Sequence, residues 1–482
     1  MKKKKRKSSI RILRNVGILL ILFLSYSAIG AYLPFVRCPS IEDTTAIEKR
    51  ADTMQTDTNT GDRVMLLATH EDALDERIRL MNLAKRELII ATYDCRDGQS
   101  TRDLMSVALE RANAGVRVRL LVDGISGWMS LSFNPMFQAL EAHDNIEIRF
   151  YNPVHILLPW HHMGRMHDKY VIVDDTAFIL GGRNMFDSFI GTYPVDKMKD
   201  DREVLVYNAG EHGHRYTESS VVQLQKYFEE IWNSDWINRF PYRRTDGSRI
   251  NETYRMLESR CEVLKQKRPQ LFAGADYSSM TVPTKGIWLI ANPIGIYVKE
   301  PVVFSQLCAL MKRARSEVII QSPYAVLNEY MLNVLSEISS AVPVTLMVNS
   351  IENSHNIAGS SDYIIHRDDI LSTGVNLLEY SGKNYHHGKA VLIDDSLSVI
   401  GCYNLDLRST YVDTELMLVI RSREMNEMLR ENMGMLLSEC TRVQDKSDQE
   451  NLNEALSPPL PLIKSIALRV LGTAVQLVRN LL

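Results

Sequence analysis

The chain has little that would support metal or nucleic-acid binding. Its six cysteines include no CxxC pair and show no metal-ligand spacing. Its net charge of −3 is uneven, because residues 1–14 carry eight positive charges and thereby leave −11 on the other 468 residues. Proteins that bind nucleic acid carry basic patches, so this acidic body disfavours a phosphodiesterase that acts on DNA.

One short motif occurs twice, 220 residues apart. A His, a Lys, an Asp and an Asn recur at the same offsets: His167, Lys169, Asp174 and Asn184 in the first copy, and His387, Lys389, Asp394 and Asn404 in the second. A single HxK usually marks a solvated strand face, but two copies with identical internal spacing are hard to reach by chance. The chain is therefore predicted to carry two halves of one active site.

Each copy is predicted to form a β-hairpin. Apolar, β-branched runs at 170–173 and 177–180 flank turn residues in the first copy, and runs at 390–393 and 397–400 do so in the second. Residues two apart share a strand face, so each His points the same way as its Lys. Folding the hairpin back brings the Asn opposite the His end, so that a His, a Lys and an Asn converge.

The acidic residues of the motif are interpreted differently. At about 3.3 Å per residue, Asp174 lies roughly 20 Å along the strand from His167 and cannot orient that imidazole. We interpret Asp174 and Asp394 as turn-forming residues that fix the hairpins. Glu203 and Glu415 are better candidates to orient the imidazoles, because each lies on the apolar strand after its hairpin, where a lone acid needs a partner. The alternative for either Glu is an ordinary surface position.

Two His, two Lys and two Asn facing each other suit phosphoryl transfer. Lys and Asn donors can stabilise charge on non-bridging phosphate oxygens. One imidazole can attack phosphorus and the other can protonate the leaving oxygen, while a carboxylate on the far ring nitrogen supports the imidazolium. The Lys pair supplies positive charge, so no cofactor and no metal are expected. Zinc at the clustered His161, His162 and His167, or at His386 and His387, is the alternative, which a neighbouring Lys disfavours.

These motifs resemble the phospholipase D superfamily signature HxKx4Dx6GSxN, with Gly182 and Cys402 at the serine positions. The surrounding sequence narrows the resemblance to bacterial cardiolipin synthases at 165–169, 181–187, 228–233 and 404–409, with Leu407 where proline is usual. The resemblance covers roughly residues 62–440. It implies an α/β fold of two lobes, each a mixed sheet flanked by helices, related by a pseudo-twofold axis with the site between them.

The repeat extends beyond the motifs, and it sets the expected domain boundaries. Residues 80–90 echo 310–320, and residues 116–122 echo 342–348. Helical periods alternate with short β-branched runs, as an α/β architecture requires. We expect the following segments: a basic tail and transmembrane anchor at 1–36, a linker at 37–61, lobe 1 at 62–245, a polar connection at 246–278, lobe 2 at 279–440, and a linker with an amphipathic helix at 441–482.

The N-terminal segment is predicted to be an uncleaved, single-pass membrane anchor. Val16–Val36 are 21 residues without a charge, long enough to span a bilayer. A cleaved secretory signal is the alternative, but the run is longer than a typical signal core, and Ala28-Ile29-Gly30, the best cleavage site, lies inside it. The positive-inside rule keeps the basic tail cytoplasmic and puts the lobes outside the cytoplasm. Residues 44–62, rich in Thr, Asp and Ala, are predicted to form a flexible tether.

The last segment carries a second membrane signal. In Leu462–Leu482 the polar residues form one stripe at helical spacing: Ser465, Arg469, Thr473, Gln476 and Asn480. This pattern is typical of a helix in the membrane interface, and a helix packed on the lobes is the alternative. Outside the cytoplasm five cysteines could pair without a deducible connectivity: Cys38, Cys95, Cys261, Cys308 and Cys440. Cys402 is expected to be a free, Ser-like donor.

The function expected from these observations is a membrane-bound phosphatidyltransferase. It would make cardiolipin from phosphatidylglycerol, with a second phospholipid as another possible donor, through a phosphatidyl-histidine intermediate on either His167 or His387. The resemblance favours His167 as the nucleophile. The partners would be phospholipid substrates and the bilayer, not nucleic acid. A hydrolytic phospholipase D that releases phosphatidic acid is the main alternative, and a scaffold that binds lipid head groups without turnover is another.

Overall fold

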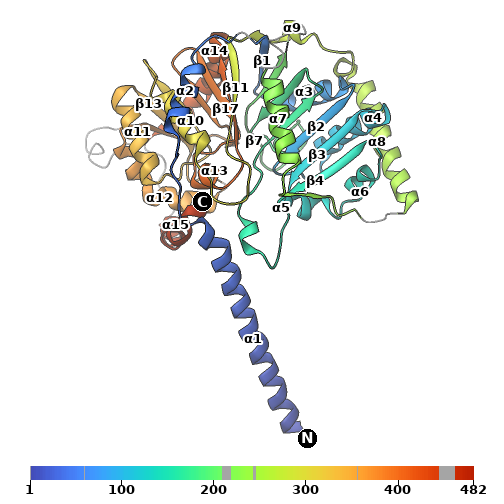
Figure 1. Ribbon diagram of the computed structural model, residues 1–482, viewed down its shortest axis with the longest axis vertical. Helices are drawn as coiled ribbons and strands as arrows, with labels where there is room; N and C mark the ends of the chain where they lie inside the picture. The colour runs from blue at the N-terminus through green and yellow to red at the C-terminus, as the bar shows by residue number, and fades with distance from the viewer. Residues whose placement is uncertain (1, 59, 209–218, 243–245, 355, 444–461) are drawn as a thin grey trace.

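Two α/β lobes lie side by side, and a long helix leads away from them (Figure 1). The computed structural model describes residues 2–58, 60–208, 219–242, 246–354, 356–443 and 462–482. Within these residues the sheet of lobe 1 has nine strands, β10-β1-β8-β6-β5-β2-β3-β4-β9, and that of lobe 2 has eight, β11-β18-β17-β16-β12-β13-β14-β19. From β1 and β11 onward the two orders correspond strand for strand. The predicted pair of repeated α/β lobes is confirmed.

Lobe 1 is built on a mixed sheet, in which β2, β3 and β4 run parallel, β5 runs antiparallel to β2, and β6 runs antiparallel to β5. Its strands are β1 Asp62–Leu67, β2 Glu87–Thr92, β3 Arg117–Asp123, β4 Ile146–Tyr151, β5 Tyr170–Val173, β6 Ala177–Gly181, β8 Glu203–Asn208, β9 Ile237–Arg239 and β10 Val282–Pro283. Its helices, with those of the connection, are α3 His70–Asn82, α4 Gln99–Asn113, α5 Gly124–Ser126, the π-helix η2 Gly127–Leu131, α6 Pro135–Glu141, η3 Pro159–His162, α7 Ser220–Trp232, α8 Gly247–Lys267, η5 Pro269–Leu271 and α9 Tyr277–Met280.

Lobe 2 repeats this arrangement. Its strands are β11 Gly286–Ala291, β12 Val318–Gln321, β13 Val344–Asn349, β14 Asn376–Tyr380, β16 Ala390–Ile393, β17 Leu397–Gly401, β18 Leu416–Arg421 and β19 Cys440–Arg442. Its helices are α10 Val302–Met311, α11 Glu329–Ala341, α12 Ile357–Ser372, α13 Leu407–Tyr411 and α14 Arg423–Leu437. A short parallel pair, β7 Lys199–Asp200 and β15 Tyr385–His386, joins the two lobes.

The apolar core follows the same symmetry. One cluster lies between the lobe 1 sheet and α3, α4 and α6, and another lies between the lobe 2 sheet and α10, α11 and α12. A third contains side chains of both sheets together with α7 and α14, including Ile172, Phe178, Leu392 and Leu418. Because burial of apolar area is the main favourable term in folding, this shared cluster holds the lobes together as one unit.

The two motif hairpins form as predicted. Strand β5 pairs with β6, and β16 pairs with β17, in antiparallel register. Asp174 and Asp394 lie in the turns with left-handed backbone, at φ 50° and 53°. The Asp174 carboxylate accepts hydrogen bonds from the backbone N–H groups of residues 85–87, and Asp394 accepts them from residues 315–317. Each carboxylate thus ties its hairpin to the start of the neighbouring strand, as the turn-forming interpretation requires.

The flexible tether predicted for residues 44–62 is wrong. Residues Thr44–Thr53 form helix α2, which Asp43 caps by accepting from Ala46 N at 2.9 Å. Ala51 and Met54 on its inner face are fully buried, and Arg50 donates to Leu289 O at 2.6 Å in lobe 2. The spacing of Ile47, Ala51 and Met54 makes one apolar stripe, which the Thr- and Asp-rich composition concealed.

The two ends of the chain each form a helix. Helix α1, Lys2–Tyr32, continues into η1, Leu33–Phe35, and includes an apolar segment, Ile12–Phe35, long enough to cross a membrane. Helix α15, Leu462–Val475, and η6, Gln476–Leu481, lie in the last part of the predicted segment 441–482, of which residues 444–461 are outside the described residues. Gln476 and Arg479 of η6 both bond to the Asp362 carboxylate of α12, and helix α15 packs on α12. Its Ile466 and Val470 side chains remain exposed.

Removing the Asp394 carboxylate should destabilise the protein. Asp394→Ala leaves the N–H groups of Arg315 and Ser316 without their acceptor and puts a residue that disfavours left-handed backbone in the turn. We expect a loss of about 2 kcal/mol, which lowers the melting temperature of a unit of this size by about 2 °C. The matched control is Asp395→Ala, since Asp395 is the exposed next residue of the same turn. Equal melting temperatures for the two variants, measured by circular dichroism in detergent, would contradict this role.

Candidate active site

The two HxK segments meet where the lobes contact each other. The segment that precedes Lys169 bridges to lobe 2 through Met166 and Thr414, which pair in parallel. The segment that precedes Lys389 pairs with lobe 1 through β15 and β7. Each motif is therefore flanked by a segment of the opposite lobe, which supplies the polar partners described next.

The imidazole of His167 is held by lobe 2. Its Nδ1 lies 2.8 Å from Glu415 Oε1, and its backbone N donates to Thr414 Oγ1 at 3.2 Å. The Tyr93 ring lies edge-on to the imidazole at 5.0 Å between centroids. Burial, followed by the charge of Lys169, lowers the pKa of His167 well below its ordinary value. The imidazole is thus neutral near pH 7, with Nε2 as the nitrogen that remains for a reacting atom.

The imidazole of His387 is held by lobe 1 in the same way. Its Nδ1 lies 2.6 Å from Asp201 Oδ2, and its backbone N donates to Asp200 O at 2.6 Å. The Phe189 ring lies edge-on to it at 5.0 Å. Burial, and then the charge of Lys389, lowers the pKa of His387 to about 3. The carboxylate partner of each imidazole thus comes from the opposite lobe.

The expectation that Glu203 orients an imidazole is wrong. Glu203 is fully buried within lobe 1, where Arg77 donates to both of its carboxylate oxygens at 2.6 Å. The sheet register explains the difference, because Gly181 pairs with Glu203 whereas the equivalent Gly401 pairs with Met417. Glu415 is therefore equivalent to Asp201, two residues before Glu203. In each lobe the acid that holds an imidazole lies two residues before the residue that pairs with the hairpin glycine, so an alignment of the two copies on this pair identifies Asp201.

The two carboxylates differ in their electrostatics. Burial opposes ionisation of Asp201, but the Lys389 charge and the hydrogen bond with His387 outweigh it and lower its pKa below the ordinary value. Burial of Glu415 dominates instead and raises its pKa well above the ordinary value, although Lys169 acts in the opposite sense. Asp201 is therefore the better partner for a positively charged imidazole.

Both lysines of the motif are buried at the site, at 1% and 2% exposure for Lys169 and Lys389. Each ammonium donates to the backbone carbonyl of its own motif histidine. Lys389 Nζ also lies 3.0 Å from His387 Nε2 and 3.6 Å from Asp201 Oδ2. Burial lowers the pKa of both lysines, to about 8 for Lys389. Two cations confined in one buried place favour an anionic ligand between them.

The asparagines and the residues at the serine positions complete the site. Asn184 Oδ1 accepts from Asp94 N at 3.2 Å, which leaves its amide N–H groups to donate elsewhere. Cys402 is a free, buried thiol, whose Sγ accepts from Leu416 N at 3.1 Å, so that it contacts the backbone of β18. At position 182 a side chain would overlap the Asp201 carboxylate, since a Cβ there would lie 2.4 Å from Oδ2. Glycine at this position makes room for the acid that holds His387.

The histidine clusters considered for zinc are occupied otherwise. His161 Nδ1 lies 3.1 Å from Asn152 Oδ1, and His162 Nε2 lies 2.9 Å from His155 O. His386 Nδ1 lies 3.0 Å from Gln321 Nε2. Among the described residues one trio has ligand spacing, His167, Cys402 and Glu415, within 4.8 Å of one another. The Lys169 charge beside this trio makes it a poor cation site.

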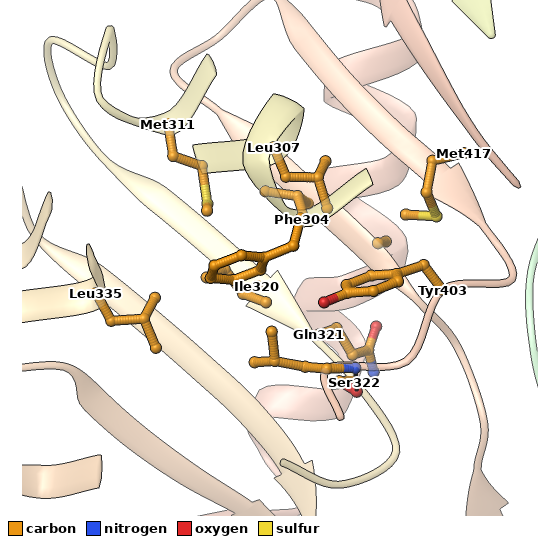
Figure 2. Close-up of a pocket in the computed structure, with 12 residues that line it drawn as sticks. Phe304, Leu307, Met311, Ile320, Gln321, Ser322, Leu335, Tyr403 and Met417 are labelled. Carbon is orange, nitrogen blue, oxygen red and sulfur yellow. Dashed lines mark hydrogen bonds between the residues drawn. The ribbon is translucent and has the colours of Figure 1, made fainter. Parts of the chain in front are cut away.

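A small apolar cavity lies beside the site within lobe 2 (Figure 2). Side chains of α10 and the sheet line it, among them Phe304, Leu307 and Met417, and Gln321 lies at one end. Gln321 accepts a hydrogen bond from Arg202 of lobe 1 and so connects this core to the lobe interface. Because hydrocarbon lines almost all of the cavity, the phosphate chemistry belongs to the polar cluster of His and Lys side chains.

A comparison with protein families identifies the fold. The family described as "Cardiolipin synthase, PLD-like domain" matches residues 78–232 and 307–437, which include both HxK motifs and more than half of the chain. The chain belongs to this family. Its PLD-like lobes are therefore those of a phospholipase D-type phospholipid enzyme.

Individual relatives agree with the family. Cardiolipin synthase C of Escherichia coli (strain K12) is 24% identical over 418 residues, which cover 74% of this chain and 81% of the relative. An uncharacterized protein of Helicobacter pylori (strain J99 / ATCC 700824) is 24% identical over 389 residues, which cover 73% of this chain and 74% of that protein. The crystal structure of phosphatidylserine synthase from Haemophilus influenzae Rd KW20 has the same fold, with a TM-score of 0.61 at 14% identity over 90% of this chain and 100% of that one.

Substitution of Asp201, Glu415 and Glu203 should distinguish acids that are needed for turnover from an acid that is needed for stability. Asp201→Asn removes the charge beside Nδ1 of His387, and Glu415→Gln replaces the carboxyl group that holds Nδ1 of His167, so turnover should fall by roughly 10³-fold or more while the protein stays folded. Glu203→Gln instead weakens the buried pair with Arg77 and should lower the stability by about 3 kcal/mol. The measurements are kcat of the folded fraction and the melting temperature. A stable, inactive Glu203→Gln protein, or full activity of Asp201→Asn, would refute the assignment.

Proposed function

We propose that this protein is a membrane-bound phosphatidyltransferase that makes cardiolipin from phosphatidylglycerol through a phosphatidyl-histidine intermediate. The observation that carries the proposal is the pair of buried imidazoles, each bonded through Nδ1 to a carboxylate of the opposite lobe. Such a pair offers a nucleophile and a general acid on either side of one phosphodiester. Relatives named cardiolipin synthase support the choice of substrate.

In the first step Nε2 of His167 attacks phosphorus of phosphatidylglycerol. The bond from phosphorus to the glycerol oxygen breaks, and the leaving oxygen takes a proton from His387. The ammonium groups of Lys169 and Lys389, with the amides of the motif asparagines, stabilise the charge on the non-bridging oxygens. Burial and then the lysine charges lower the pKa of His387, and the bound phosphodiester anion opposes both effects by stabilising the protonated imidazole that donates the proton.

In the second step the hydroxyl of another phosphatidylglycerol attacks the same phosphorus. His387, now neutral, takes the proton of that hydroxyl, the bond from phosphorus to nitrogen breaks, and cardiolipin leaves with His167 restored. An acceptor lipid held in place reacts faster than dilute water, because positioning replaces a bimolecular encounter. Hydrolysis to phosphatidic acid is the same reaction with water as acceptor.

The electrostatics support His167 as the nucleophile. His387 faces Asp201, whose pKa is lowered and which therefore stays ionised to support an imidazolium during proton transfer. His167 faces Glu415, whose pKa is raised by burial, so this imidazole stays neutral and nucleophilic. The family resemblance favours the same assignment.

We also propose that α1 anchors the lobes to the outer face of a bacterial cytoplasmic membrane. The apolar segment Ile12–Phe35 is 6% buried, so that almost all of its surface is free to face lipid. The basic residues before it favour a cytoplasmic N-terminus. The exposed apolar residues of α15 would then face the same bilayer surface as the end of α1, since Asn480 donates to Val36 O.

Lipid product analysis of the purified full-length protein tests this function. With phosphatidylglycerol vesicles as the sole substrate, we expect cardiolipin and glycerol in equal amounts, with little phosphatidic acid. His167→Ala and His387→Ala should each abolish both products, because both imidazoles serve in each step. Mass spectrometry of acid-free, denatured enzyme after a lipid pulse should find phosphatidyl on His167. Phosphatidic acid as the main product would establish the hydrolase instead, and a label on His387 would reverse the roles.

The pH dependence should have an alkaline limb set by Lys389. Its pKa is lowered by burial to about 8, so the ammonium loses its proton, and the site loses a positive charge, as the pH rises through that value. We expect kcat/KM, which reports titration of the free enzyme, to be constant near pH 7 and to fall above pH 8. Lys389→Arg keeps the charge at higher pH, so its remaining activity should not show this limb. An alkaline limb that is unchanged in Lys389→Arg would assign the titration to another group.

A further inference from the structure

A loop of lobe 1, residues 153–163, runs down beside α1 (Figure 1). Its sequence, PVHILLPWHHM, contains no Asp, Glu, Lys or Arg. At its tip Ile156 and Leu157 are 69% and 71% exposed, although both side chains are wholly aliphatic. Exposed apolar side chains that lie together are typical of a contact with a protein or a membrane.

The loop contacts α1 well inside the apolar segment of that helix. Tyr26 Oη donates to Leu157 O at 2.8 Å. Further along α1, Gly30 packs against Pro159 so closely that a Cβ at residue 30 would lie 2.5 Å from the proline Cγ. Both positions fall within Ile12–Phe35, which the proposed function places in the bilayer. The loop thus lies against a part of the helix that lipid surrounds.

The depth of the loop tip follows from helix geometry. Tyr26 precedes Phe35 by nine residues, which is about 13 Å along a helix that rises 1.5 Å per residue. The whole segment of 24 residues is about 36 Å long, whereas the hydrocarbon core of a bilayer is about 30 Å thick. Wherever a core of this thickness lies within the segment, Tyr26 is at least about 7 Å inside the hydrocarbon boundary, and its hydroxyl donates to Leu157 O.

We propose that residues 154–158 insert into the acyl-chain layer of the leaflet on the lobe side and form a second membrane contact beside α1. The proposal rests on the membrane anchorage of the proposed function. A neighbouring turn adds to the contact, because Gly124 abuts Pro153 and the adjacent π-helix η2 exposes Trp128 and Met129 at 54% and 70%. Trp side chains are favoured where hydrocarbon meets the head groups.

The base of the loop connects it to the active site. Asn152 closes the loop by donating through Nδ2 to His161 O at 2.6 Å and to Gly164 O at 2.7 Å. Arg165, the next residue, is buried and donates to Asp123 Oδ2 at 2.9 Å. His167 follows Gly164 by three residues, so at most about 11 Å of chain separates them. Insertion of the tip therefore holds the nucleophile near the head-group layer, where the phosphodiester of a lipid lies.

Depth-dependent fluorescence quenching tests the insertion. An environment-sensitive fluorophore is attached to Leu157→Cys in full-length protein that carries Cys38→Ser and Cys440→Ser, since the other four cysteines are buried. The protein is reconstituted in dioleoylphosphatidylcholine vesicles with or without nitroxide on the acyl chains. Met435→Cys on α14 is the matched control, because Met435 is 63% exposed and α14 lies at the end of the lobes away from α1 (Figure 1). Leu22→Cys reports on the anchor itself.

We expect the acyl-chain nitroxide to quench the label at 157 about twofold or more, as at 22, and to leave the label at 435 unchanged. A label that is quenched at 22 but not at 157 would overturn the loop insertion alone. Absence of quenching at both positions would overturn the loop insertion together with the anchorage on which it rests. Equal quenching at 157 and 435 would show non-specific adsorption and would also refute the proposal.

A kinetic comparison provides an independent readout. Leu157→Asp puts a charge at the proposed depth and should lower the ratio of activity on phosphatidylglycerol vesicles to activity on detergent-dispersed short-chain lipid by about tenfold. Met435→Asp should leave the ratio unchanged. A ratio that Leu157→Asp leaves unchanged would refute insertion even if the enzyme is a phosphatidyltransferase, since both activities are measured on the same preparation.

Discussion

The exchange of carboxylates between the lobes is the interaction on which the site depends. Asp201 of lobe 1 holds His387 of lobe 2, and Glu415 of lobe 2 holds His167 of lobe 1. Neither lobe on its own can orient its imidazole, so the site exists only when the shared apolar cluster between the sheets is packed. A change that loosens this interface therefore acts on catalysis as directly as a change of a motif residue.

This arrangement also accounts for the burial of so many ionisable groups in one place. Unpaired charges in a protein interior are costly, and they persist where each has a partner of opposite sign or a hydrogen bond. The Asp201 carboxylate meets Lys389 and His387, and Arg183 near it pairs with Glu203, two residues after Asp201. The buried Arg77 pair with Glu203 is thus part of the electrostatic support of the site, although it touches neither imidazole.

The local features of the site could be predicted from the sequence, whereas the partners across the interface could not. Alternation along a strand and the chemistry of turns are sufficient to predict the hairpins, the convergence of His, Lys and Asn, and the structural role of Asp174. The partner of His387 depends on sheet register and on docking of the lobes, and neither leaves a periodic signal. Spacing alone therefore favoured Glu203 over Asp201. Helix α2 was not predicted for a related reason. Its three apolar residues form a stripe that is buried only because lobe 2 packs against it.

Docking of α2 has a consequence for how a lipid enzyme of this kind would meet its substrate. A flexible tether would let the lobes sample solution above a bilayer, but α2 is packed on lobe 2 and only eight residues separate η1 from it. With α1 in a bilayer, the site stays at one height above the surface. Encounter then becomes a two-dimensional search, in which lipids arrive by lateral diffusion. The reaction rate would follow the mole fraction of substrate in the membrane rather than its bulk concentration.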